Sequence, residues 1–380
     1  MSFLRKALVI LGITFGLYIL LDLAVAAIFG QPHPAIPDFD RIPALRRQAY
    51  VSPAFAREYV RNDFLEAVPG GPLMWEPLRD GRYFNVEALA PTGAHYRRTA
   101  NPPAEGRPVV TVLLLGASQV YGTEVPDDLT IASLLAKRLD ALDPAHAYVV
   151  YNAGVQSVGS LQELWRLQYE LDHGLKPDWV VLLGGGLDVV RGVYQAAPGA
   201  PSAVGHGLIG RLLHDYFPLN IYRWFRVWLS GRATEGALRE PPAHLADPAR
   251  LQDLIHQTVD GYAASQQRMA ELAKAHGTRF LTVLDPNLYT ADFTRMSADY
   301  AYADGVCRRH SPGIQDAIRA AWPAMTGALQ GLKGEGIRTL DLSAVFRDKT
   351  QDIFVDCDHF NAAGNALIAD RLAAALLGAR

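Results

Sequence analysis

The chain has 380 residues, of which 49% are hydrophobic and 20% are charged, and its formal net charge is −3. This composition is typical of a globular protein with one large domain and appended segments. Lys and Arg are spread along the chain instead of forming a basic cluster, so the charge gives no electrostatic reason to expect a nucleic acid as a partner.

An apolar stretch near the N-terminus is the first predicted element. Residues 7–29 are almost wholly apolar and follow Arg5 and Lys6. As a helix they would extend roughly 34 Å, which is enough to cross a bilayer, so we expect a transmembrane helix within residues 1–30. The basic flank favours a single-pass topology, with the N-terminus in the cytoplasm and the remainder of the chain exported. A cleaved signal peptide ending at residues 24–26 is the alternative, and it also predicts export.

Residues 31–107 form a lead-in that is rich in Pro and aromatic residues. Prolines recur between Pro32 and Pro77, which excludes a long helix. Aromatic side chains such as Trp75 and Phe84 argue against free disorder. We therefore expect this lead-in to pack on the main domain.

Strand and helix patterns alternate from residue 109 onward. Short apolar runs bounded by Gly or Pro predict buried strands, and apolar residues at helical spacing predict the helices between them. The predicted strands are 109–115, 148–151, 179–183, 279–284 and 337–340. The predicted helices are 130–142, 160–171, 251–275, 314–332 and 363–377. This alternation predicts an α/β domain over residues 108–380, with a five-stranded parallel sheet covered on both faces.

A helical insertion of about residues 190–250 separates the third and fourth predicted strands. Its segment 216–229 combines aromatic residues with two arginines. Two interpretations stay open: a helical cap that packs against the domain, or a segment that rests on a membrane surface.

Two segments at opposite ends of the α/β pattern carry residues suited to acyl chemistry. Ser118 follows the first strand, at the carboxyl edge where open α/β sheets bind ligands, and His359 lies just before the last helix. A serine hydroxyl is a poor nucleophile until a base removes its proton, and that base needs an acid partner to fix its tautomer. We assign Ser118 as nucleophile, His359 as general base and Asp356 as its orienting acid, although Asp358 could exchange roles with Asp356. Taken singly, the serine also fits a helix N-cap and the histidine a structural residue.

With these blocks in this order, the chain resembles the SGNH (GDSL) hydrolase family, membrane-anchored bacterial type, over about residues 109–378. The blocks that carry the resemblance are Gly-Ala-Ser-Gln-Val-Tyr-Gly at 116–122, Asn-Ala-Gly at 152–154 and Asp-Cys-Asp-His at 356–359. The resemblance implies a flavodoxin-like three-layer sandwich and an esterase, deacetylase or acyltransferase. It also implies that the backbone N–H groups of Ser118 and Gly154 bind the oxyanion.

The third block of the family departs from its usual pattern. Where the family has an Asn that donates to the oxyanion, this chain has Leu187, and losing one such donor typically costs on the order of 10²–10³ in turnover. Gln119 and Gln156 are the candidates to replace it. The glycines of this block either allow close backbone approach to substrate or form a plain flexible turn. The expected substrate contacts are Gln119, Gln156, Gly185, Gly186 and Asp188.

Cys307 and Cys357 are the only two cysteines in the chain. In an exported protein such a pair predicts a disulfide, with two separate buried thiols as the alternative. The sequence lacks the paired Cys/His spacing of a metal site. Residues 116–122 match neither the dinucleotide fingerprint nor the Walker A pattern. We therefore expect no metal and no cofactor.

Together, the resemblance and the predicted topology imply a serine esterase or acyltransferase, of the O-deacetylase or O-acetyltransferase type, that acts through an acyl-serine. They imply a protein anchored in the bacterial inner membrane, with its catalytic domain in the periplasm or outside the cell. Its expected partners are an acylated glycan or small ester as substrate, the membrane through the N-terminal helix, and an envelope protein. The alternative is a catalytically impaired binding or assembly protein of the envelope, which Leu187 and the aromatic insertion motivate.

Overall fold

The computed structural model describes six parts of the chain. These are residues 3–29, 52–60, 76, 78–197, 240–291 and 298–378. The chain divides into two compact units, one formed by Met1–Pro37 with Ala203–Leu238 and the other by Asp38–Ser202 with Arg239–Arg380. The aromatic segment 216–229 of the insertion, for which a cap or a membrane contact is expected, lies outside the described residues.

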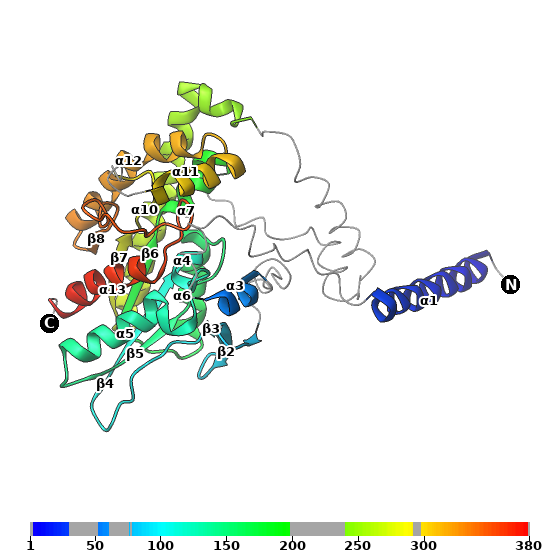
Figure 1. Cartoon of the computed structure of the whole chain (residues 1–380), viewed down its shortest axis with the longest axis horizontal. Coiled ribbons are helices and arrows are strands. Elements are labelled where there is room, and N and C mark those ends of the chain that lie inside the picture. Colours follow the sequence, from blue (N-terminus) through cyan, green and yellow to red (C-terminus); the bar gives the residue numbers. More distant parts are fainter. Residues whose placement is uncertain are drawn as a thin grey trace. The chain divides into compact units, whose positions relative to one another are not determined.

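In the first unit, the described part is one helix, α1 (Phe3–Phe29), of 27 residues (Figure 1). A helix with the length and apolar character of a membrane crossing is not found among the described residues. The structure therefore does not support the transmembrane helix expected within residues 1–30.

The second unit is built around one sheet of eight strands, in the order β1-β2-β3-β5-β4-β6-β7-β8. All five predicted strands are present, and they pair with one another in parallel. They are β4 (Val109–Gly116), β5 (Ala147–Asn152), β6 (Trp179–Gly184), β7 (Arg279–Leu284) and β8 (Arg338–Asp341). β4 lies between β5 and β6, so its carboxyl end is flanked by the ends of two other parallel strands.

The expectation of a purely parallel, five-stranded sheet is wrong, because the lead-in adds three antiparallel strands. These are β1 (Arg79–Asp80), β2 (Asn85–Leu89) and β3 (Ala94–Arg97). β3 joins the parallel group by pairing Arg97 with Asn152 of β5. Strands of two to five residues carry too little periodicity to be recognised locally, and they depend on β5 to supply hydrogen-bond partners.

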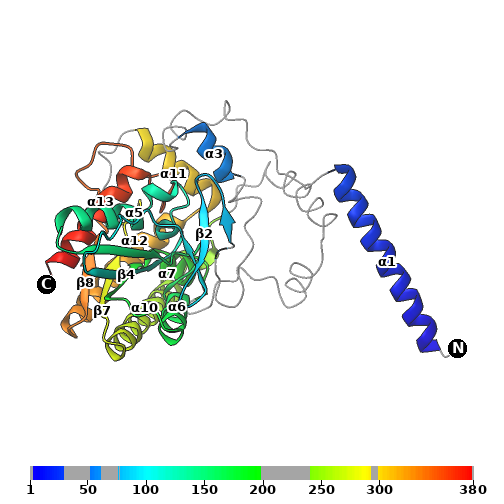
Figure 2. The ribbon, with the colours of Figure 1, turned by 90° about the horizontal axis from the view of Figure 1, so that it is seen from below.

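Helices cover both faces of the parallel strands, as expected for a three-layer domain. α5 (Ile131–Leu142) packs against α13 (Ala362–Leu377) on one face, and α6 (Ser160–Asp172) packs against α10 (Pro248–Ala275) on the other (Figure 2). α12 (Ile314–Gly334) lies against α10. The ends of the predicted helices differ from the observed ones by at most three residues.

The sequence of β4 explains why both faces need a cover. Val112, Leu113, Leu114 and Leu115 are all 0% exposed. Because side chains alternate along a strand, Val112 and Leu114 belong to the core cluster that includes α5 and α13, and Leu113 and Leu115 to the cluster that includes α6 and α10. A strand that buries every side chain reads as a continuous apolar run, which is typical of a parallel sheet.

The remaining described elements are short or peripheral. They are α3 (Pro53–Val60), α4 (Ser118–Tyr121), the 3₁₀ helix η3 (Asp127–Leu129), α7 (Gly186–Val189), the π-helical turn η4 (Val190–Tyr194), the 3₁₀ helix η5 (Ala243–Ala246) and α11 (Ala298–His310). α3 belongs to the lead-in and packs on it and on the main domain: Phe55 stacks on Phe84 with ring centroids 5.1 Å apart, and Glu58 accepts hydrogen bonds from the backbone N–H groups of Tyr83 and Phe84.

Candidate active site

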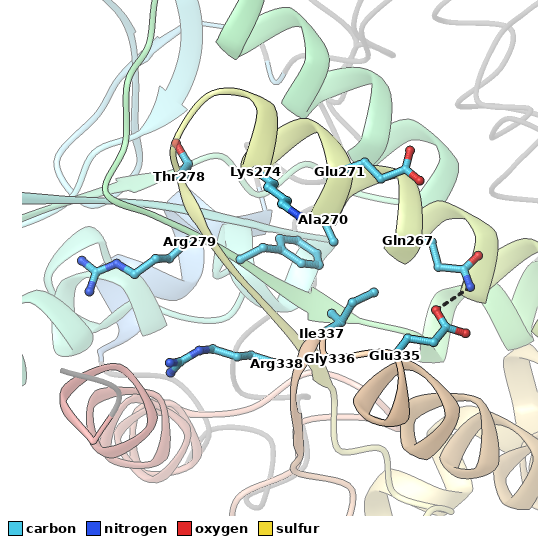
Figure 3. Close-up of a pocket in the computed structure, with 11 residues that line it drawn as sticks. Gln267, Ala270, Glu271, Lys274, Thr278, Arg279, Glu335, Gly336, Ile337 and Arg338 are labelled. Carbon is cyan, nitrogen blue, oxygen red and sulfur yellow. Dashed lines mark hydrogen bonds between the residues drawn. The ribbon is translucent and has the colours of Figure 1, made fainter.

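Two of the cavities among the described residues lie away from Ser118 and His359. A groove of about 630 Å³ lies where β7 and β8 begin, with Phe280, Ile337 and charged side chains such as Lys274 and Glu335 along it (Figure 3). Parallel strands start at one edge and end at the other, so this groove lies at the edge opposite to Ser118. A second cavity, of about 320 Å³, lies between α6, α7 and α10.

The end of β4 places Ser118 at the carboxyl edge of the sheet. Gly116 closes the strand, and a Cβ atom there would lie 2.5 Å from the carbonyl oxygen of Leu183 and 2.4 Å from Val120 Cγ2. Only glycine therefore allows the chain to turn so tightly from β4 into α4. Ser118 is the first residue of α4 and is partly exposed. Its backbone N–H has no acceptor within the helix at this position.

The structure brings the two ends of the α/β pattern into contact. The Ser118 hydroxyl lies 2.7 Å from His359 Nε2, across 241 positions of sequence. On the other side of the ring, His359 Nδ1 lies 2.8 Å from Asp356 Oδ2. If Nδ1 carries the proton and donates it to Asp356, Nε2 is left to accept the serine proton. This is the order of groups that activates a serine hydroxyl.

Asp356 is the carboxylate that holds His359 in place. Its Oδ1 accepts hydrogen bonds from the backbone N–H groups of Asp358, at 3.0 Å, and of His359, at 2.9 Å. The carboxylate of Asp358 lies 3.5 Å from His359 Nδ1, which is too long for a good hydrogen bond. Of the two acids considered from the sequence, Asp356 has the geometry of the orienting partner. Asn361 then begins α13 by accepting from the N–H groups of Ala363 and Gly364.

The charges of this loop favour a protonated histidine. Burial alone would lower the pKa of His359, but the carboxylates of Asp356 and Asp358, followed by Glu124, raise it well above its ordinary value. Burial alone would raise the pKa of Asp356, but the charge and hydrogen bond of His359 lower it. Burial, together with the neighbouring Asp356, raises the pKa of Asp358 to about 7. The imidazolium that forms when His359 takes a proton is thus stabilised by its surroundings.

The second block packs directly against the nucleophile helix. A Cβ atom at Gly154 would lie 2.2 Å from the backbone nitrogen of Tyr121, so only glycine fits. The N–H of Gly154, expected to bind the oxyanion, donates to Asn152 Oδ1 at 3.1 Å. Asn152 in turn donates to the carbonyl of Val120 at 2.9 Å. An oxyanion would therefore have to share the Gly154 N–H with Asn152.

Leu187 occupies the apolar side of the site. It packs with Ala117, Val155 and Val158, and Ala117 directly precedes the nucleophile. Gln119, one of the two candidates to replace the missing donor, instead donates from Nε2 to the carboxylate of Asp285 at 2.7 Å.

The other expected substrate contacts have bonds within the protein. The backbone N–H of Gln156 donates to Glu76. Asp188 accepts from the backbone N–H of Ser160 at 3.1 Å and from its hydroxyl at 2.8 Å. The N–H of Gly186 donates to Asp285 at 2.8 Å.

Gly185 has a backbone conformation and a packing contact that favour glycine. It has φ = 114°, and an added Cβ atom would lie 2.5 Å from Leu284 Cδ1. The glycine is thus needed for backbone conformation and packing, and the close backbone approach to substrate stays a prediction.

Asp285 and Glu124 are buried acids of the site that the sequence analysis missed. Asp285 directly follows β7, is 2% exposed, and has its pKa raised to about 7 by burial. A signal for it existed, because it is a polar residue at the carboxyl end of a predicted strand. Glu124 lies in the turn after α4 and is 4% exposed. Nothing in its sequence neighbourhood distinguishes it from a surface glutamate.

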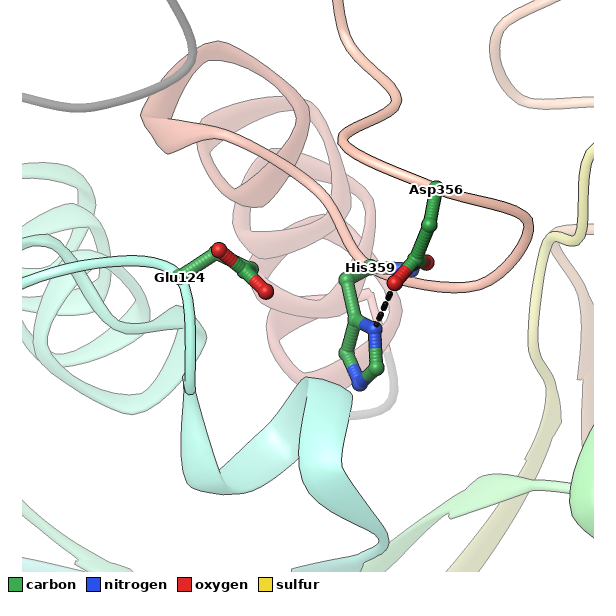
Figure 4. Close-up of side chains that lie close together, drawn as sticks. All are labelled: Glu124, Asp356 and His359. Atoms are coloured by element: carbon green, nitrogen blue, oxygen red, sulfur yellow. Dashed lines mark hydrogen bonds and ion pairs between the residues drawn. The ribbon is translucent and has the colours of Figure 1, made fainter. Parts of the chain in front are cut away.

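Glu124, in the turn after α4, lies close to the ring of His359 and to Asp356 (Figure 4). One oxygen of Glu124, one of Asp356 and one ring nitrogen of His359 lie within 4.8 Å of one another, which is a spacing that a cation could bridge. Both ring nitrogens, however, are already engaged, by Asp356 and by Ser118. The arrangement therefore suits proton transfer from Ser118.

The predicted disulfide between Cys307 and Cys357 is formed, and the alternative of two separate thiols is wrong. It joins α11 to the loop that carries Asp356 and His359. The carbonyl of Cys357 also accepts a hydrogen bond from the N–H of Leu288 at 2.8 Å. The disulfide to α11 and the hydrogen bond from Leu288 thus both fix this loop to other parts of the chain.

No protein-family model matches the chain, and no curated protein matches it. Among solved structures it is similar to LAE5, an α/β hydrolase from the metagenome of Lake Arreo, with 14% identity, a TM-score of 0.40, and 71% of this chain and 95% of that chain covered. It is also similar to Est24, a carbohydrate acetylesterase from Sinorhizobium meliloti, with 12% identity, a TM-score of 0.40, and 71% and 100% covered. A lipolytic protein of the G-D-S-L family from Veillonella parvula has 12% identity, a TM-score of 0.39, and 71% and 99% covered. Such low identities and TM-scores establish neither a family nor an activity.

Proposed function

We propose that the protein is a serine-dependent ester hydrolase or acyltransferase that works through an acyl-serine. The observation that carries this proposal is the continuous contact from Ser118 to His359, at 2.7 Å, and from His359 to Asp356, at 2.8 Å. The three groups meet at the carboxyl edge of the sheet, where open α/β sheets bind ligands, and Ser118 is partly exposed there.

The mechanism follows from this order of groups. His359 Nε2 takes the hydroxyl proton as Ser118 Oγ attacks the ester carbonyl, and Asp356 stabilises the imidazolium. The oxyanion of the tetrahedral intermediate is bound by the backbone N–H of Ser118 and by the shared N–H of Gly154. The imidazolium then protonates the leaving alcohol, which departs and leaves Ser118 acylated. Water or a second hydroxyl, deprotonated by His359, releases the acyl group and regenerates the serine.

We further propose an acylated envelope glycan or a small ester as the substrate, and an O-deacetylase or O-acetyltransferase as the enzyme type. We also propose that the catalytic unit faces the periplasm or the cell exterior. The Cys307–Cys357 disulfide supports this location, because disulfides persist in oxidising compartments.

A second candidate function is a catalytically impaired binding or assembly protein of the envelope. Leu187 favours it, because an apolar side chain beside the nucleophile cannot donate to an oxyanion.

A fluorophosphonate probe distinguishes the two functions. Wild type is expected to be labelled at Ser118, and Ser118→Ala to remain unlabelled. Ser265→Ala is the matched control, because its hydroxyl only returns to the carbonyl of Gly261 within α10, and it is expected to label like wild type. A folded wild type that does not react would contradict the enzyme and favour the binding protein. Turnover of a chromogenic acetyl ester, with and without a sugar acceptor, then separates hydrolysis from transfer.

A further inference from the structure

Glu124 is a second acid at the catalytic histidine, and the proposed mechanism does not use it. One oxygen of its carboxylate, one oxygen of Asp356 and one ring nitrogen of His359 lie within 4.8 Å of one another (Figure 4). We propose that Glu124 is a positioning residue that acts through His359, by stabilising the imidazolium formed when Ser118 is deprotonated. The inference rests on the proposed function, because it assigns Glu124 a part in the same proton transfer.

The lead-in helps to hold this carboxylate. Glu124 is 4% exposed, and its Oε1 accepts a hydrogen bond from the Tyr59 hydroxyl at 2.9 Å. Tyr59 belongs to α3 and is itself fixed in an aromatic cluster with Phe55 and Phe84. A donor 65 positions away along the chain thus orients an acid beside the catalytic ring. A hydrogen bond to a carboxylate favours its charged form.

Glu124 acts on His359 through its charge, because both ring nitrogens of His359 already have other partners. Nδ1 is engaged by Asp356 and Nε2 by Ser118, so neither nitrogen needs Glu124 as a hydrogen-bond partner. The charged groups that face the ring are Asp356 and Asp358 from its own loop and Glu124 from the turn after α4. Of these three acids, only Glu124 belongs to a segment other than the loop that carries His359.

A fixed negative charge at this place has two consequences. It stabilises the imidazolium, which appears only as the reaction proceeds, so it lowers the barrier for attack by Ser118. It also raises the pKa of His359, so that more of the enzyme carries a protonated, inactive base at a given pH. Removing the charge is expected to raise the barrier for attack by Ser118, which lowers activity. It is also expected to lower the pKa of His359, so that more of the enzyme carries an unprotonated, active base near neutral pH.

The test is the pH dependence of kcat/KM for a chromogenic ester, measured for wild type and Glu124→Gln. The acidic limb reports the pKa of the general base, His359, in the free enzyme. In Glu124→Gln the limb is expected to move to lower pH by about one unit, because a negative charge near the ring is lost. The plateau at high pH is expected to fall by roughly tenfold, in kcat and not in KM. Tyr59→Phe is expected to move the limb in the same direction by less, because the carboxylate stays but loses its orienting donor.

Glu271→Gln is the matched control. Glu271 is an exposed acid on α10 that pairs with Arg268, and its loss is expected to leave the limb in place. If Glu124→Gln is less stable but its limb stays at the wild-type pH, Glu124 is only structural and the inference is overturned.

A second readout does not need turnover. The 11 histidines can be followed by NMR as pH is raised, with His359 assigned by its absence in His359→Asn. The pKa of the His359 ring is expected to fall in Glu124→Gln, even in a protein that hydrolyses nothing. An unlabelled wild type with this pKa shift would refute the proposed function alone, whereas a labelled wild type without it would refute the role of Glu124 alone.

Discussion

At the scale of single residues, the balance between charge and apolar packing around Ser118 sets what the site can do. The acids Asp356 and Glu124 lie on the histidine side of the site. On the other side, Leu187 packs against Ala117 next to the nucleophile. The histidine side is therefore well equipped to accept a proton, while the oxyanion side has few donors. We expect attack by Ser118 to be limited by stabilisation of the oxyanion and not by the strength of the base.

Leu187→Asn tests this imbalance. An asparagine at this position supplies a side-chain N–H near the nucleophile, so kcat/KM for a chromogenic ester is expected to rise on the order of 10- to 100-fold. Leu187→Met is the control, because it keeps an apolar side chain of similar volume and is expected to leave kcat/KM close to wild type. Equal or lower activity in a folded Leu187→Asn would mean that Leu187 lies outside the reach of the oxyanion.

At the scale of elements, the site depends on how closely the second block approaches α4. Gly154 lies against the backbone of Tyr121, and the side chain of Asn152 bonds to both the Gly154 N–H and the carbonyl of Val120. The loop after β5 and the helix after β4 are thus joined as one rigid piece. Asp285 joins a third element, because it accepts from Gln119 in α4 and from the N–H of Gly186 at the start of α7.

Gly154→Ala tests this close approach. A Cβ atom 2.2 Å from a backbone nitrogen forces the loop away from α4, so the rate of fluorophosphonate labelling is expected to fall on the order of 100-fold and the melting temperature to drop. Gly261→Ala is the matched control, since a Cβ atom there meets nothing within 4 Å. Alanine inside α10 is expected to keep full labelling and to stabilise the helix by up to about 1 kcal/mol. Normal labelling of Gly154→Ala would show that this contact does not position the site.

At the scale of the whole catalytic unit, the fold brings together residues that are far apart in sequence. Ser118 and His359 are separated by 241 positions. The helix that follows His359, α13, packs on α5, which comes after β4 and Ser118. The disulfide adds a covalent link between α11 and the histidine loop. We expect this link to stabilise the unit against unfolding and to keep the loop ordered.

Replacing both Cys307 and Cys357 by serine tests the contribution of the disulfide. The two residues are 50 positions apart, and a crosslink of that span is expected to contribute roughly 4 kcal/mol by restricting the unfolded chain. Denaturant unfolding of the double variant should show that loss, and wild type treated with a reductant should match it. A difference below about 1 kcal/mol would contradict the expected role, as would a reduced wild type that unfolds differently from the variant.

Patterns within short segments of the sequence were sufficient to predict the five parallel strands and the helices between them. The apolar run from Val109 to Leu115 predicts a strand, because burial on both faces gives a continuous run of apolar residues. The spacing of apolar residues in the final helix predicts that helix, because burial of one face gives a helical repeat. The parallel direction of these strands also follows, because a helix between two strands is the crossover connection that a parallel pair needs. The paired motifs of Ser118 and His359 could be recognised for the same reason: each is defined by a few adjacent residues.

Side-chain partners across the fold could not be predicted in this way. The sequence by itself predicted the five parallel strands, favoured the Cys307–Cys357 pair and placed Ser118 and His359 as candidates for one site. The choice of Asp356 over Asp358 as the partner of His359 needed the structure. Only the tertiary structure decided that Gln119 binds Asp285, that Asn152 holds the Gly154 N–H, and that Glu124 faces His359. The physical reason is that a hydrogen bond or a charge interaction depends on a distance of a few ångströms, and the packing of several elements sets that distance independently of separation along the chain.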